Sequence, residues 1–135
     1  VKRRLCDLPP HIDEIYTTEH LDEVLPKADY VILALPQTKE TIHLFDQKRL
    51  MLMKKDAVLI NVGRGSAIVS EDLKTVLKKG HLYGVGLDVF EEEPLPEDNK
   101  LWDREEVILI PHNSFVGENN QKRLSKIIME NLKGK

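Results

Sequence analysis

The chain has 135 residues, of which 41% are hydrophobic and 32% charged, a balance sufficient for one globular domain with a buried core. Its formal net charge of −3 and its dispersed basic residues argue against nucleic acid or a membrane surface as the partner. The apolar runs are too short to span a bilayer, and the N-terminal VKRRL lacks the apolar core of a signal peptide. Because the only cysteine, Cys6, has no internal disulfide partner, we expect a soluble cytoplasmic protein.

Short apolar runs alternate with amphipathic segments along the chain. In chain order, the sequence predicts a helix over 18–28, a strand over 30–35, a helix over 47–53 and a strand over 57–62. A helix over 71–79, strands over 83–89 and 107–110, and a final helix over about 117–132 follow. We expect Asp46 to cap the second helix, and the third to be capped by Ser70 and ended by Gly80. The apolar runs are continuous, which is typical of strands buried on both faces. We therefore predict an α/β fold with right-handed crossovers and a parallel sheet covered by helices on both faces.

Each predicted strand is followed by a residue that can bind a ligand or react. Pro36 follows the first strand, the sequence GRG at 63–65 follows the second, Asp88 ends the third, and Pro111 and His112 follow the fourth. The carboxyl ends of parallel strands meet at one edge of the sheet, which is where ligands bind in folds of this class. The sequence therefore predicts a binding site at that edge.

Taken singly, these residues also have purely structural interpretations. Arg64 fits an exposed turn, although its flanking glycines would let the backbone approach a ligand while the guanidinium holds a carboxylate. His112 fits a structural histidine, and the other four histidines form no recognisable group in the sequence. Asp88 fits a cap of the turn that follows it, and residues 91–93 fit a solvated acidic run. Their common place at one sheet edge favours function.

Three ordered motifs, NVGRG (61–65), GVGLDVFEEEPLP (84–96) and ILIPH (108–112), carry a family resemblance. They closely resemble the nicotinamide-binding domain of D-isomer-specific 2-hydroxyacid dehydrogenases, a family that includes phosphoglycerate dehydrogenases and glyoxylate or hydroxypyruvate reductases. LPQTKET (35–41) looks like the proline-threonine loop of the same family. The resemblance runs through nearly the whole chain. It implies an oxidoreductase that transfers a hydride between NAD(P)H and a small 2-oxo or 2-hydroxy acid.

The resemblance also implies a role for each matching residue. Arg64 matches the arginine that binds the carboxylate and carbonyl oxygen of the substrate, His112 matches the acid/base residue, and Glu93 matches its carboxylate partner. A carboxylate beside a histidine stabilises the protonated imidazole, which can then donate a proton. Asp88 matches an aspartate of the cofactor pocket near the nicotinamide. The implied cofactor-binding residues are Lys2, Arg3, Arg4, Leu35, Pro36, Thr41, Val62, Gly63, Arg64, Asp88 and His112, and no metal site is expected.

One departure from the family is large, because the chain contains no Gly-x-Gly-x-x-Gly motif for the cofactor pyrophosphate. We therefore expect residues 1–135 to form a partial NAD(P)-binding Rossmann domain, from the tail of its second strand to the connecting C-terminal helix. This incomplete, doubly wound parallel sheet would lack the first βα unit and the substrate domain, and the piece would be inactive alone. Because the missing first strand is central, we expect a partner chain or an altered strand order to fill the gap.

Smaller features bear on the cofactor and the partners. Lys2, Arg3 and Arg4, with no acidic residue before Asp7, favour NADP over NAD, although a solvated basic turn also explains them. The family resemblance implies a homodimer, with strand exchange as a further possibility for the fragment. Asn113 and Phe115 replace smaller residues and would alter the rim of the pocket. Two other function classes stay open: a non-catalytic nucleotide-binding interaction module of the same family, and an unrelated Rossmann-like binding domain.

Overall fold

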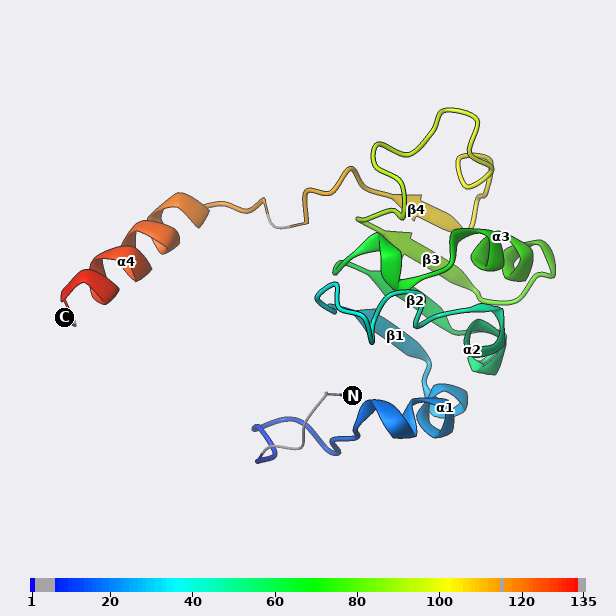
Figure 1. Cartoon of the computed structure of the whole chain (residues 1–135), viewed down its shortest axis with the longest axis horizontal. Coiled ribbons are helices and arrows are strands. Elements are labelled where there is room, and N and C mark those ends of the chain that lie inside the picture. Colours follow the sequence, from blue (N-terminus) through cyan, green and yellow to red (C-terminus); the bar gives the residue numbers. More distant parts are fainter. Residues whose placement is uncertain (2–6, 115, 134–135) are drawn as a thin grey trace.

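The structure is a computed structural model that describes residues 1, 7–114 and 116–133 (Figure 1). Its strands are β1 (Tyr30–Leu33), β2 (Val58–Asn61), β3 (Gly84–Leu87) and β4 (Val107–Leu109). Its helices are α1 (Leu21–Val24), α2 (Gln47–Leu52), α3 (Ser70–Lys78) and α4 (Asn120–Lys133), with 3-10 turns at Thr18–His20, Leu25–Lys27 and Gly65–Ala67. The predicted alternation of strands and helices is confirmed.

The four strands form one parallel sheet in the order β1-β2-β3-β4. Ile32 of β1 lies opposite Ile60 of β2, which lies opposite Gly86 of β3, and Gly86 in turn pairs with Ile108 of β4. This order is that of one half of a doubly wound sheet. Within the described residues the sheet has no internal gap. The edge of β1, beside which the first strand was expected to be missing, is open. Pairing of that edge with another chain stays a prediction.

Helices cover only one face of the described sheet, so the prediction of cover on both faces is wrong for this part of the chain. On the covered face, the strand residues Leu33, Leu59, Val85 and Leu87 join one hydrophobic core with residues of α2 and α3. On the other face, Tyr30, Ile32 and Ile108 are 69%, 62% and 66% exposed. The reason is that the strand order advances in one direction, so right-handed crossovers place every connecting helix on the same side.

Local signals set most helix ends. The side chain of Asp46 accepts a hydrogen bond from the Arg49 backbone N–H at 2.9 Å, which confirms the predicted cap of α2. Gly80 follows α3 with a φ of +66°, a conformation that glycine adopts without strain. The predicted helix over 18–28 instead splits into a 3-10 turn, α1 and a second 3-10 turn. Pro26 accounts for the second break, because proline lacks the N–H that would continue α1.

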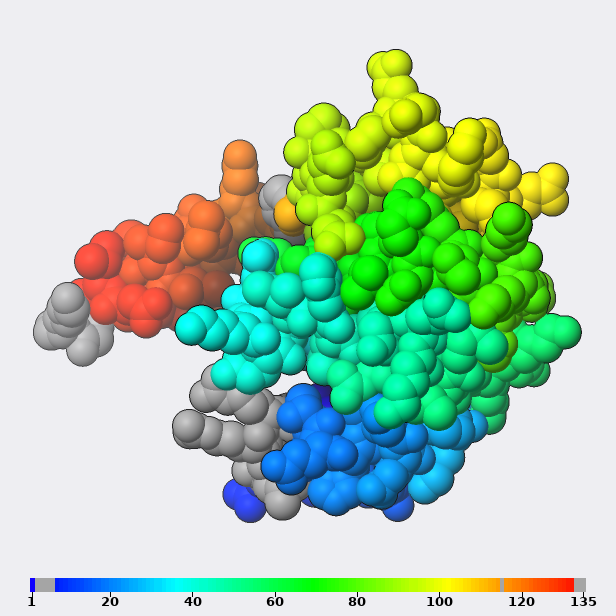
Figure 2. Space-filling model, turned by 45° about the vertical axis from the view of Figure 1, so that its right-hand side comes forward, coloured from blue at the N-terminus to red at the C-terminus, as the bar shows by residue number. Residues whose placement is uncertain are grey.

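Helix α4 projects away from the sheet (Figures 1 and 2). The predicted helix is confirmed, but its apolar residues Leu124, Ile127, Ile128 and Leu132 are between 48% and 65% exposed. Among the described residues, no helix has the length and apolar character needed to cross a bilayer. None of the predicted site residues lies in α4, and those that the structure describes lie in the sheet or in the loops at its carboxyl edge.

Candidate active site

The turn that follows β2 is built on Asn61, the last residue of that strand. The Asn61 side chain is fully buried, accepts the Gly63 N–H at 3.1 Å and donates to the Arg64 carbonyl at 3.0 Å. These two bonds close the turn between Asn61 and Arg64, and Arg64 is exposed. Sequence reasoning missed Asn61, although a polar residue at the end of a buried strand was a signal for it.

The two glycines of this turn admit neighbouring backbone, which corrects the expectation that they admit a ligand. A Cβ on Gly63 would lie 2.6 Å from the Leu35 nitrogen, and one on Gly65 would lie 1.8 Å from the carbonyl carbon and oxygen of Phe90. Neither glycine has a positive φ. The loop after β2 therefore packs closely against the loops after β1 and β3, because Gly63 and Gly65 have no side chain to keep the backbones apart.

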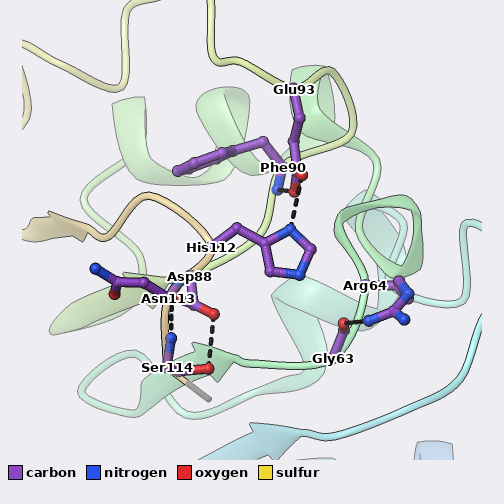
Figure 3. Close-up of polar contacts among 8 residues, drawn as sticks. All are labelled: Gly63, Arg64, Asp88, Phe90, Glu93, His112, Asn113 and Ser114. Carbon is purple, nitrogen blue, oxygen red and sulfur yellow. Dashed lines mark hydrogen bonds and ion pairs between the residues drawn. The ribbon is translucent and has the colours of Figure 1, made fainter. Parts of the chain in front are cut away.

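Arg64 is exposed at this edge, and its Nη1 donates to the Gly63 carbonyl at 2.8 Å (Figure 3). This contact uses one of the five N–H donors of the guanidinium. The positive charge of Arg64 also helps to lower the pKa of Glu93 on the loop after β3. Arg64 is thus an accessible cation within electrostatic range of the predicted acid/base pair. Val62, which precedes this turn, is 41% exposed.

Glu93 and His112 form the predicted contact, with Glu93 Oε2 and His112 Nδ1 2.8 Å apart (Figure 3). The other oxygen of Glu93 accepts the Phe90 backbone N–H at 2.9 Å. That bond lowers the pKa of Glu93 despite partial burial, with His112 and Arg64 contributing in the same direction. An ionised carboxylate only accepts hydrogen bonds, so Nδ1 carries the proton of this contact and Nε2 is left to exchange a proton with a bound molecule.

Asp88 fixes the segment that carries His112. The Asp88 side chain is 2% exposed and accepts the backbone N–H groups of Asn113 and Ser114 at 2.8 and 3.0 Å and the Ser114 hydroxyl at 2.6 Å. Its carbonyl accepts the His112 N–H at 2.8 Å, and His112 has a left-handed φ of 49°. Burial opposes ionisation of Asp88, yet these hydrogen bonds and the nearby His112 hold its pKa below the usual value. The interpretation of Asp88 as a cap of the turn that follows it is wrong, because its partners follow β4.

Glu91 forms a second carboxylate-histidine pair, with Glu91 Oε1 and His43 Nε2 2.6 Å apart. Its other oxygen accepts the Ser70 N–H at 3.0 Å. Burial opposes ionisation of Glu91, but the bonds from Ser70 and His43 lower its pKa. Three expectations are thereby wrong: Glu91 is not merely solvated, the other histidines include one in a pair, and Ser70 does not cap α3. The helix begins at Ser70 itself, with Val69 as its N-cap, because a distant carboxylate supplies the acceptor.

The loop after β1 borders a groove of about 680 Å³ that runs along the open edge of the sheet. Of the predicted cofactor-binding residues, Leu35, Pro36 and Thr41 line it. The Thr41 hydroxyl closes this loop by donating to the Pro36 carbonyl at 2.6 Å and accepting the Thr38 N–H at 2.8 Å. These three residues follow β1 at the carboxyl edge of the sheet, where a cofactor would bind in a fold of this class.

Among the other predicted cofactor residues, Lys2, Arg3 and Arg4 lie outside the described residues. Val62, Gly63, Arg64, Asp88 and His112 stand on the loops or strand ends after β2, β3 and β4. In the described part of the chain, no group of three or more His, Cys, Asp or Glu residues could hold a metal ion. The arrangement therefore offers a cation, a carboxylate-histidine pair and a neighbouring groove at one sheet edge.

Comparison with known proteins identifies the family to which the chain belongs. The profile of the D-isomer specific 2-hydroxyacid dehydrogenase NAD binding domain matches residues 7–114. The chain is 40% identical over 112 residues to the glyoxylate reductase of Pyrococcus horikoshii, covering 83% of this chain and 33% of that protein. It is 37% identical over 125 residues to glyoxylate/hydroxypyruvate reductase B of Escherichia fergusonii, covering 91% and 39%. The chain thus spans 33% and 39% of the length of these two relatives.

Solved structures agree with the sequence comparison. A D-isomer specific 2-hydroxyacid dehydrogenase family protein from Aeromonas salmonicida superimposes with a TM-score of 0.81 at 41% identity, covering 90% of this chain and 38% of that one. A probable 2-hydroxyacid dehydrogenase from Rhizobium etli gives a TM-score of 0.76 at 32% identity, covering 89% and 40%. The chain therefore belongs to the D-isomer specific 2-hydroxyacid dehydrogenase family, whose NAD-binding domain its residues 7–114 match.

Proposed function

We propose that this chain forms the catalytic edge of an oxidoreductase that transfers a hydride between NAD(P)H and a small 2-oxo acid or the corresponding D-2-hydroxy acid. The observation that carries the proposal is the 2.8 Å contact between His112 and Glu93 at the carboxyl edge of a parallel sheet. Residues 1–135 would form a partial NAD(P)-binding Rossmann domain, from the tail of its second strand to the connecting C-terminal helix. Because the chain spans about a third of its relatives, turnover would require the longer protein.

In this proposal, each side chain performs one task. Leu35, Pro36 and Thr41 would help to hold NAD(P)H, which would supply the hydride when bound. His112 donates the proton from Nε2 to the oxygen of the reduced carbonyl. Glu93 accepts the hydrogen bond from His112 Nδ1 and balances the positive charge of the protonated imidazole. Arg64 binds the acid group, since a guanidinium can hold a carboxylate through two parallel hydrogen bonds. Asp88 keeps the backbone of His112 in place, next to the cofactor pocket.

The relatives narrow the proposed substrate and cofactor. Several are named glyoxylate reductases and one is named a glyoxylate/hydroxypyruvate reductase, which supports these two acids as substrates. Two of the similar solved structures are described in complex with NADPH and with NADP. Together with Lys2, Arg3 and Arg4, they support NADP in preference to NAD. We further propose a homodimer in the cytoplasm.

The test is cofactor oxidation by the full-length protein that contains this chain, followed by nicotinamide absorbance. NADPH and NADH are offered separately with glyoxylate, hydroxypyruvate and other 2-oxo acids. We expect oxidation that depends on the acid, that is faster with NADPH, and that is lost in His112→Ala but retained in the exposed control His11→Ala. Cofactor binding without oxidation of any acid would contradict the proposal and would favour the non-catalytic nucleotide-binding module.

A further inference from the structure

Three consecutive glutamates follow β3, and they occupy three different environments. Glu93 contacts His112 in the proposed acid/base pair. Glu92 is exposed, and among the described residues it has no hydrogen-bond or ion-pair partner. Glu91 contacts both His43 and the first residue of α3, Ser70. Neither the proposed reaction nor the family resemblance gives Glu91 a role.

Glu91 connects the three loops that meet at the carboxyl edge. His43 stands on the loop after β1, and Ser70 begins the helix that follows β2. Both partners are themselves fixed: the His43 backbone N–H donates to the Ser66 carbonyl at 2.7 Å, and Ser70 belongs to a helix of nine residues. A carboxylate at the first turn of a helix is also favoured by the helix dipole. Glu91 therefore anchors its own loop at two independent points.

The anchored turn is the one that presents Glu93. Glu93 lies two residues after Glu91, and its Oε1 accepts the N–H of Phe90, the residue just before Glu91. Glu91 therefore lies within the turn that this bond closes. If the two bonds of Glu91 were lost, the Phe90 backbone would still pack against Gly65, but the segment that carries Glu93 would lose two side-chain contacts that hold it. The distance between Glu93 and His112 would then no longer be fixed.

We propose that Glu91 is a positioning residue, which holds the 90–93 turn against His43 and Ser70 so that Glu93 stays in contact with His112. The lowered pKa of Glu91 agrees with this, since it keeps the carboxylate ionised and able to accept both hydrogen bonds. The catalytic consequence of this inference rests on the proposed function, whereas its structural part does not. Glu92, its exposed neighbour, offers a matched control at the adjacent position.

The structural arm measures the His112 ring by nuclear magnetic resonance in the full-length protein that contains this chain. The Nδ1 proton and nitrogen shifts report the bond to Glu93. We expect Glu92→Ala to leave them unchanged and Glu91→Ala to abolish the bonded signal. Glu91→Gln should restore it, because the amide oxygen can accept the Ser70 N–H and the amide N–H can donate to His43. A bonded signal in Glu91→Ala equal to that in Glu92→Ala would overturn the proposal.

A second variant keeps the test decisive if Glu91→Ala fails to fold. The double variant His43→Ala with Ser70→Pro leaves Glu91 in place and removes both of its partners. Proline is well tolerated at the first position of a helix, and Val69 already has the extended conformation that precedes proline. We expect the bonded His112 signal to be lost here as well. Its retention would show that Glu93 needs no anchor at Glu91.

The catalytic arm uses the full-length protein. We expect Glu91→Ala to lower kcat about 10- to 100-fold, because small misplacements of catalytic groups have effects of this order. KM for the 2-oxo acid should change little, because Arg64 stands on a different loop, and Glu91→Gln should recover most of kcat. An unchanged kcat in Glu91→Ala would overturn the proposal. If the unsubstituted protein oxidises no cofactor, the proposed function fails, while the resonance measurement still decides whether Glu91 positions Glu93.

Discussion

Gly65→Ala should damage the site more than any other single-methyl change at this edge. A Cβ at residue 65 would lie 1.8 Å from the carbonyl carbon and oxygen of Phe90 and 2.5 Å from the Glu91 nitrogen. Ordinary carbon contacts are about 3.5 to 4.0 Å, so the 90–91 backbone would have to move by roughly 1.5 to 2 Å. All three atoms belong to the main chain, and therefore no side-chain rotation can relieve the overlap.

The expected cost follows from that overlap. Overpacking typically costs about 1 to 3 kcal/mol, and the backbone contact places Gly65→Ala near the top, at about 3 kcal/mol of unfolding free energy. For a chain of this size that corresponds to a fall in Tm of roughly 10 °C. The displaced backbone also carries Glu91 and Glu93, so the contact of Glu93 with His112 should be lost too. Stability and the acid/base pair should therefore fail together.

Gly86→Ala provides the matched control. A Cβ at residue 86 would lie 3.8 Å from its nearest neighbour, the Ile60 side chain, which is an ordinary contact. We expect its Tm to stay within about 2 °C of the parent, or to rise slightly, because alanine restricts the unfolded chain. The assay is thermal unfolding followed by circular dichroism, with the His112 resonance measured on the same samples. A Tm for Gly65→Ala equal to that of Gly86→Ala would refute the reasoning.

Two further predictions concern the buried polar groups. The pKa of Asp88 is lowered from 3.8, so its contribution to stability is present above pH 3.8 and is lost as the pH falls through the lower folded-state pKa. Asp88→Asn should therefore reduce the loss of unfolding free energy with falling pH, measured by urea unfolding at several acidic pH values. An unchanged dependence of the unfolding free energy on pH would contradict the lowered pKa of Asp88. Asn61→Ala should cost about 2 to 4 kcal/mol in the same urea assay, since it leaves the Gly63 N–H and the Arg64 carbonyl without their buried partner. A cost below about 1 kcal/mol would show that water replaces the Asn61 side chain.

The sequence alone determined those features that depend on near neighbours. Four continuous apolar runs predicted the four strands, and crossovers of helical length predicted their parallel arrangement. The cap at Asp46 and the ending at Gly80 were predictable because their hydrogen bonds and dihedral angles involve residues within one turn of the helix. The pairing of Glu93 with His112 was predictable as well, through the family motifs rather than through any local rule.

Only the tertiary structure decided how distant loops meet at the carboxyl edge. Glu91 contacts His43 across 48 residues and Ser70 across 21, and Asp88 contacts Asn113 across 25. No periodicity encodes such pairs, because they follow from the register of neighbouring strands and the length of each crossover. The same holds for Gly65, whose missing side chain makes room for Phe90. The uncovered sheet face has a related cause, since one direction of strand order places all the connecting helices on one side.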